Sequence, residues 1–161
     1  MLRGANFFKK KLNNDDYSEI KYKNAVSRRN KKKIISYSVA SIRRRSHPDN
    51  FYKGHISQVC AVLKEVVDHE SPIHKEEAER RVVQYWGIGA VGRKVRAILE
   101  EAALICTQEK MFKKKGDFFW AIDMDVPIVR NRDSADVTKN IEYIAPEEIR
   151  EAAIFVLQKE Y

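Results

Sequence analysis

The chain of 161 residues is 43% hydrophobic and carries a formal net charge of +8, with a sequence pI of about 9.4. This length supports one modest domain with its own core and is short for two. No apolar run reaches the ~18 residues that a membrane span requires, and the first residues lack the apolar core of a secretory signal peptide, so we expect a cytoplasmic protein with no membrane partner.

The two cysteines, Cys60 and Cys106, belong to no CxxC motif and to no Cys/His cluster with metal-ligand spacing. Both fall on the apolar stripes of predicted helices, which favours buried, reduced thiols. We therefore expect neither a metal site nor a cofactor.

The positive charge is concentrated near the N-terminus. Residues 1–50 hold 14 Lys and Arg against 4 Asp and Glu, a balance of +10, whereas residues 51–161 hold 17 against 19, a balance of −2. The basic runs at 28–33 and 43–45 fit a phosphate-binding arm and equally a solvated, partly disordered linker. Between them, "IISYSVASI" fits either a short strand or a helix, and "HPDN" at 47–50 reads as a break.

A nuclease remnant has one candidate motif in this first third. Glu19-Ile20-Lys21 is an ExK, and Asp15 and Asp16 precede it. Restriction-type nucleases hold a metal with two acids while a lysine stabilises the developing charge. Such a site takes its acids from neighbouring strands, however, and Asp16 stands too close to Glu19 in sequence for that. A chance ExK is common, so we expect no catalysis here.

From Phe51 onward apolar residues recur at helical spacing, which predicts a first helix over about 54–69 and a second over about 75–86. Between them, Pro72 biases the preceding residue away from helix, so a short extended stretch is expected. His74 stands where the second helix would be capped. A capping or packing role is the ordinary one for such a histidine, and a role as ligand or base is the alternative.

"WGIGAVGRKVR" supplies the next break and the start of a third helix, expected over about 90–108. At about 100° per residue, Arg93 lies opposite the apolar stripe, and Lys94 and Arg96 flank it. The exposed N-terminal half of this helix is therefore cationic. Its C-terminal half is acidic, with Glu100, Glu101 and Glu109.

"MFKKKGDFFWAID" predicts a β-hairpin with strands at 109–114 and 117–122 and a tight turn at Lys115-Gly116. Helix, short strand, helix, helix and hairpin is the order of a winged helix-turn-helix, so the expected fold class is mostly α with a small β-hairpin. In that arrangement the third helix enters the major groove and the hairpin contacts the DNA backbone or minor groove. The candidate DNA-binding residues are Arg93, Lys94, Arg96, Lys113, Lys114 and Lys115. A solvated turn is the alternative reading of the three lysines.

The C-terminal part begins with Asp123-Met124-Asp125, which could be read as a metal pair but stands where acids ordinarily end a strand. Pro146 and the two acids after it predict the start of a C-terminal helix. Its apolar face, formed by Ile149, Ala152, Ala153, Val156 and Leu157, is expected to close the domain's own core. Docking of that face to a partner helix or a neighbouring domain is the alternative.

Several of these segments carry a family resemblance that spans roughly residues 51–158. Ser71-Pro72-Ile73-His74, "GRKVR" in the third helix, "GDFFW" in the hairpin and "PEEI" near the end resemble the uncharacterised C-terminal domain of large superfamily-1 helicase-related proteins. In that family the domain follows a Vsr-like restriction-endonuclease domain. The resemblance implies an accessory role in DNA restriction or defence and brings no catalytic residue with it.

The sequence thus predicts a basic N-terminal segment over 1–50 and a winged-helix domain with a C-terminal helix over 51–161. Its expected role is that of a non-catalytic accessory domain that binds DNA mainly through the backbone. The alternative is a docking module for helicase or nuclease domains of the same system, without DNA contact. DNA binding requires the third helix and the hairpin to form one positive face, and neutralisation of that face by the acids of the third helix would favour docking.

Overall fold

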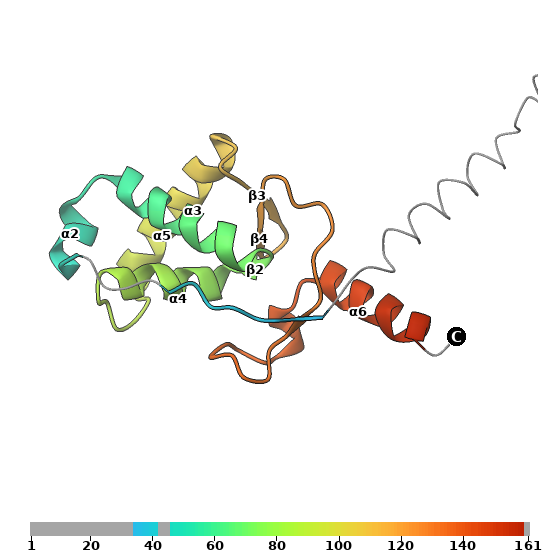
Figure 1. Cartoon of the computed structure of the whole chain (residues 1–161). Helices are drawn as coiled ribbons and strands as arrows, with labels where there is room; N and C mark the ends of the chain where they lie inside the picture. Colours follow the sequence, from blue (N-terminus) through green and yellow to red (C-terminus); the bar gives the residue numbers. More distant parts are fainter. Residues whose placement is uncertain (1–33, 42–45, 160–161) are drawn as a thin grey trace, which may run out of the picture. The chain divides into compact units, whose positions relative to one another are not determined.

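The computed structural model describes residues 34–41 and 46–159 (Figure 1). The two basic runs at 28–33 and 43–45 and the ExK with Asp15, Asp16, Glu19 and Lys21 lie outside the described residues. The chain is mostly helical with short strands, as the sequence predicts.

Three helices build the main core: α3 (Ile56–Glu70), α4 (Lys75–Tyr85) and α5 (Arg93–Gln108). α3 packs against both of the others, and Figure 1 shows the three grouped on one side of the hairpin. Most residues at the apolar helical positions are buried, namely Val59, Leu63, Val66, Val67, Ala78, Val82, Val83, Trp86, Val95, Leu99 and Ala102, whereas Ile56, Val91 and Ile98 are partly buried against them. Cys60 and Cys106 are free and buried in the same core.

Local signals explain where these helices begin and end. His74 caps α4, because its Nδ1 accepts a hydrogen bond from the Glu76 amide at 3.3 Å. Gly87 follows α4 with a positive φ of 66°, as a residue just after a helix often does. α5 begins at Arg93 and not at about 90, since Gly92 has an extended backbone and no side chain to cap the helix.

The predicted hairpin is antiparallel, and an additional strand joins it in a sheet of order β2-β4-β3. The strands are β2 (Ile73–His74), β3 (Phe112–Lys115) and β4 (Phe118–Ala121). The turn lies one residue later than expected, at Gly116-Asp117, because Gly116 has the positive φ of 57° that suits the first position of a two-residue loop.

Side chains alternate across this hairpin, and each face has its own core. Phe112 and Phe119 pack with α3, α4 and α5. Phe118 and Trp120 face away from these helices and pack with Ala145 and Met124. Trp120 is fully buried, and its neighbours belong to the segment after the hairpin and not to the three helices.

Two elements precede α3. β1 (Ile35–Ser36) pairs in parallel with β5 (Arg130–Asn131), so "IISYSVASI" contains a short strand. α2 (Pro48–Lys53) occupies the stretch that was expected to be a break. Pro48 is tolerated in its first turn and His47 caps it. All described residues belong to one compact unit, which therefore includes part of the segment before residue 51.

The C-terminal segment contains the 3₁₀ helix η1 (Ile141–Tyr143) and α6 (Pro146–Lys159), which starts at the predicted proline. The predicted packing of α6 is wrong. Three apolar residues of the predicted face are exposed, Ile149 by 37%, Val156 by 54% and Leu157 by 60%, whereas Glu148 and Glu151 are buried. Arg130 on β5 and Arg132 just after it pair with Glu148 and so turn this side of the helix inward.

None of the helices in the described part of the chain has the length and apolar character that crossing a bilayer demands.

Candidate nucleic-acid interface

The N-terminal half of α5 carries three exposed cations. Arg93, Lys94 and Arg96 follow directly on the glycine that starts the helix. Within the described residues, none of the three makes an ion pair or a hydrogen bond through its side chain. The first amides of α5 also lack a side-chain cap, and the helix dipole adds positive potential at this end. This end of α5 is therefore free to bind an anion.

The three hairpin lysines do not act as one set, because alternation along β3 sends them to two faces. Lys113 donates to the Met124 carbonyl at 3.0 Å and pairs with Asp125 at 3.1 Å. The Lys115 ammonium lies 4.0 Å from the centre of the Trp120 ring. Lys114 points to the other face, toward α5, and has no ion-pair partner among the described residues. It is thus the hairpin lysine that the fold associates with the α5 cations.

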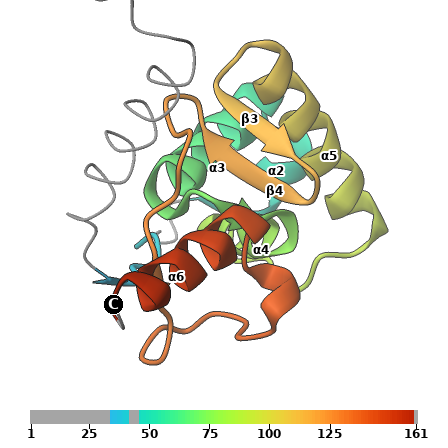
Figure 2. The same ribbon diagram turned by 90° about the vertical axis from the view of Figure 1, so that its right-hand side faces the viewer.

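A groove of about 450 Å³ joins the start of α4, the side of α5 and the hairpin. Figure 2 shows the hairpin beside α5, and both elements contribute residues to the lining of the groove. Apolar side chains on its surface come from Ala103, Leu104 and Phe119, and its charged residues are Lys75, Glu76, Glu79, Arg96, Glu100 and Lys114. The groove therefore brings together Arg96 and Lys114, but in the company of three carboxylates.

Two of these six charges are already engaged at the groove's edge. Lys75 donates to Asp117 at 2.7 Å, and this hydrogen bond lowers the pKa of the aspartate. Tyr143 donates to Glu76, which lowers the pKa of that glutamate in turn. These contacts hold the hairpin tip and η1 against the start of α4. Four charged groups remain without a close partner among the described residues: Glu79, Arg96, Glu100 and Lys114.

The two remaining carboxylates, Glu79 and Glu100, interrupt the positive surface formed by Arg96 and Lys114. Burial raises the pKa of Glu79, Arg96 opposes this shift, and Glu76 and Glu100 add to it. Glu79 and Glu100 thus offset Arg96 and Lys114 inside the groove. The cations of α5 and the hairpin therefore do not form one continuous positive face, because Glu79 and Glu100 line the groove together with Arg96 and Lys114.

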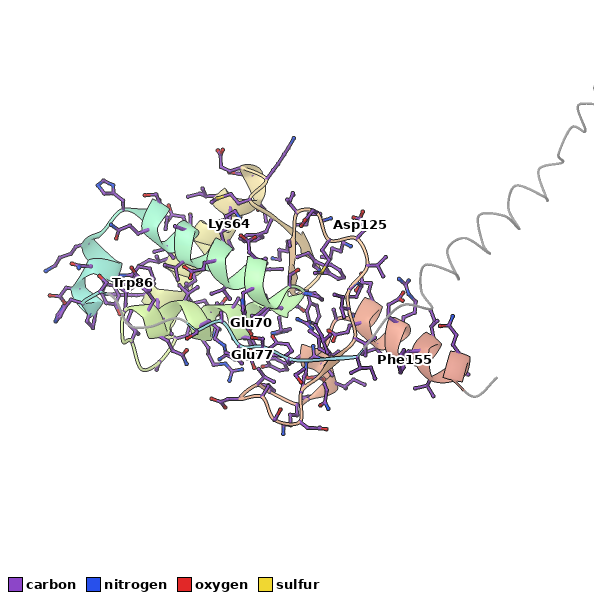
Figure 3. The ribbon with its side chains drawn as sticks, viewed as in Figure 1. Lys64, Glu70, Glu77, Trp86, Asp125 and Phe155 are labelled. Carbon is purple, nitrogen blue, oxygen red and sulfur yellow. The ribbon has the colours of Figure 1, made fainter. Side chains whose placement is uncertain are left out.

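Sequence reasoning missed a buried ionic cluster behind the sheet. Glu70, whose side chain is fully buried, accepts hydrogen bonds from the Tyr37 hydroxyl at 2.8 Å and the Ala40 amide at 2.9 Å, and pairs with Arg81 at 3.3 Å. Arg81 also pairs with Glu77 at 3.4 Å, and Figure 3 shows Glu70 and Glu77 close together beside α3 and α4. Burial raises the pKa of Tyr37, and the Glu70 charge adds to this.

A second part of this cluster joins β5 to α6. Glu148 pairs with Arg130 at 2.7 Å and with Arg132 at 2.8 Å. Arg130 also donates to the carbonyls of Glu70, Ser71 and Pro72, at 2.6, 3.2 and 2.8 Å, and so satisfies the end of α3. These charged groups form ion pairs with one another and hydrogen bonds with backbone carbonyls. Such an arrangement is typical of a structural network and not of an open binding site.

The acids after the hairpin are not gathered around a common point. Asp125 pairs with Lys113 and is 89% exposed, while Asp123 lies on the surface. Within the described residues, no group of three or more His, Cys, Asp and Glu side chains is placed to hold a metal ion.

Residues 49–97 match a family model described as a protein of unknown function (DUF3320). The match runs from α2 to the start of α5 and covers less than half of the chain. It falls within the region on which the family resemblance rests, and it includes Arg93, Lys94 and Arg96 but not the hairpin. No curated protein and no solved structure matches the chain.

Proposed function

We propose that α3, β2, α4, α5 and the hairpin form a winged helix, and that the chain is a non-catalytic DNA-binding domain. In this proposal it accompanies the helicase and nuclease parts of a DNA restriction or defence system, as the resemblance implies. The observation that carries DNA binding is the end of α5, where Arg93, Lys94 and Arg96 are exposed and unpaired within the described chain.

Unpaired cations at the start of a helix are unfavourable for the stability of the helix, because they lie at the positive end of its dipole. They are favourable for binding a phosphate. An anion there gains from the free amides and from the helix dipole. Arg and Lys mostly contact the DNA backbone, and the exposed end of α5 offers no Asn or Gln to read adenine edges. We therefore expect binding with weak sequence preference and strong dependence on salt.

The test uses the full chain, so that the basic N-terminal segment is the same in every sample. Affinity for a labelled duplex is measured by fluorescence anisotropy at several salt concentrations. Changing Arg93, Lys94 and Arg96 together to Ala should weaken binding and reduce the slope of log affinity against log salt by about 0.9 for each lost phosphate contact. In the matched control variant, Lys53, Lys64 and Lys139 are changed together to Ala. These three described lysines lie outside the groove and the hairpin.

Equal losses in the two triple variants would mean that the cations act only through net charge. The α5 contact would then be rejected.

A second candidate function is protein docking, and one observation favours it. α6 presents Ile149, Val156 and Leu157 to solvent, although a helix of an isolated domain ordinarily buries such a stripe. The acids of the groove favour the same reading, because they neutralise part of the surface that DNA would meet. Duplex affinity that is unchanged in the α5 triple variant would favour this candidate.

A further inference from the structure

The groove between α5 and the hairpin is not explained by backbone binding at the end of α5. Its volume of about 450 Å³ lies within the range of roughly 300–1,000 Å³ that is typical of small-molecule sites. It combines an apolar surface with polar groups of both signs. DNA duplexes are convex and present stacked base edges, so a hollow of this kind does not fit one.

The charges in the groove argue against phosphate as the occupant. Of the groups without a close partner in the described chain, two are carboxylates, Glu79 and Glu100, and two are cations, Arg96 and Lys114. A phosphate placed among them would meet as much repulsion as attraction. A neutral group that offers both hydrogen-bond donors and acceptors matches this set better.

An unpaired nucleobase is such a group, and DNA is the partner already proposed for the adjoining end of α5. We propose that the groove receives one unpaired guanine of the bound DNA, an inference that rests on the proposed DNA-binding function.

Guanine fits best because of the pattern on its Watson–Crick edge. Its N1–H and N2–H groups lie side by side and can both donate to one carboxylate, for which Glu79 is the half-buried candidate. Its O6 and N7 atoms accept hydrogen bonds from arginine, the commonest specific contact to this base, and Arg96 lines the same groove. Thymine places carbonyl oxygens toward the carboxylate and would be repelled.

The rest of the groove suits the flat part of a base. Leu104 is 58% exposed, so a base covering it would remove apolar area from water, and the buried Phe119 lies beneath the same surface. An unstacked base is available only where pairing is interrupted, so the inference predicts a preference for forked or gapped DNA over an intact duplex.

The test uses the full chain and a set of forked duplexes that differ only in the unpaired nucleotide at the junction. That nucleotide is guanine, hypoxanthine, cytosine, thymine or an abasic site. One well-placed base contact corresponds to about a tenfold change in affinity. The guanine fork should therefore bind about tenfold more tightly than the thymine and abasic forks. Hypoxanthine lacks the N2 amino group and should fall between them.

Glu79→Gln keeps the size of the side chain and should remove the preference for guanine while leaving affinity for the abasic fork within about twofold. Glu101→Gln is the matched control, because Glu101 is exposed on α5 but does not line the groove. Leu104→Ser, which removes the apolar surface under the base and adds no charge, should lower affinity for the guanine fork but not for the abasic fork.

Equal binding of all forks, with the α5 dependence intact, would overturn this inference and leave the proposed function standing. A guanine preference that survives Glu79→Gln would also overturn it, since the base would then bind elsewhere. If changing the α5 cations left the affinity for every DNA unchanged, the proposed function itself would be overturned.

Discussion

Arg130 and Glu148 form a bidentate pair in which Nε donates to Oε1 at 3.2 Å and Nη2 donates to Oε2 at 2.7 Å, with both side chains more than nine-tenths buried. The Arg130 amide donates to the same carboxylate at 3.0 Å. This pair joins α6 to β5, and through the carbonyls at the end of α3 it joins both to the main core.

Removing one partner of this pair should be costly. Glu148→Ala leaves Arg130 and Arg132 buried without a counter-charge, so the free energy of unfolding should fall by about 3–5 kcal/mol. Urea denaturation followed by tryptophan fluorescence measures it. Glu147→Ala, at the preceding and only half-buried residue, is the control and should cost less than about 1 kcal/mol. Equal effects of the two changes would contradict a structural role for the pair.

The same carboxylate should make stability depend on pH. Burial alone would raise the pKa of Glu148, but hydrogen bonds from Arg132 and Arg130 outweigh it and lower the pKa below its ordinary value of 4.5. A lowered pKa in the folded state contributes stability above the unfolded value and loses it as pH falls through the folded value. The stability difference between the native chain and Glu148→Ala should thus be largest near neutral pH and narrow below pH 4.5. A constant difference down to pH 3 would contradict this.

The hairpin lysines should contribute unequally to DNA binding. Lys114 is unpaired within the described chain, whereas Lys113 is held by Met124 and Asp125. Lys114→Ala should weaken duplex binding and lower the salt slope by about 0.9, the value of one phosphate contact. Lys113→Ala should change the slope by less than half of that. Anisotropy titrations at 50 to 200 mM salt distinguish the two, and the reverse order would show that the tip is rearranged on binding.

Hydrolysis of DNA is not expected. Glu19→Ala and Asp123→Ala should leave any nuclease background unchanged with magnesium or manganese present, because Asp123 lies on the surface outside any described group of ligands and the ExK lacks suitably spaced acids. Gel assays with supercoiled plasmid measure this. Metal-dependent cleavage that either change abolishes would overturn the non-catalytic assignment.

The exposed stripe of α6 should be dispensable for folding. Val156→Ser with Leu157→Ser should change the free energy of unfolding by less than about 1 kcal/mol, because both side chains are more than half exposed. Replacing two buried apolar side chains of this size by serine would lower the free energy of unfolding several times more. A large loss in the isolated chain would mean that the stripe is covered in solution.

Local patterns in the sequence were sufficient for the helices and the hairpin. Apolar spacing located α3, α4 and α5, Pro146 marked the start of α6, and "KKKGDFFW" marked the hairpin, because each signal lies within a few residues of its effect. The helix α2 is not predicted, because "HPDN" reads as a break although proline is also favoured in the first turn of a helix. The end of α5 was exposed as predicted, because the position of Arg93 depends only on the period of its own helix.

The distribution of side chains between surfaces was decided by tertiary contacts. Alternation on β3 separates Lys114 from its two neighbours, and only the segment around Ala145 determines that Trp120 is buried on the far side of the hairpin. The orientation of α6 follows from Arg130 and Arg132, which lie 18 and 16 positions before Glu148. No periodic pattern encodes such a pairing, because the partners lie on different elements. By itself, the sequence thus determined which elements form and which charges they carry, while the tertiary structure decided which of these charges are paired with one another.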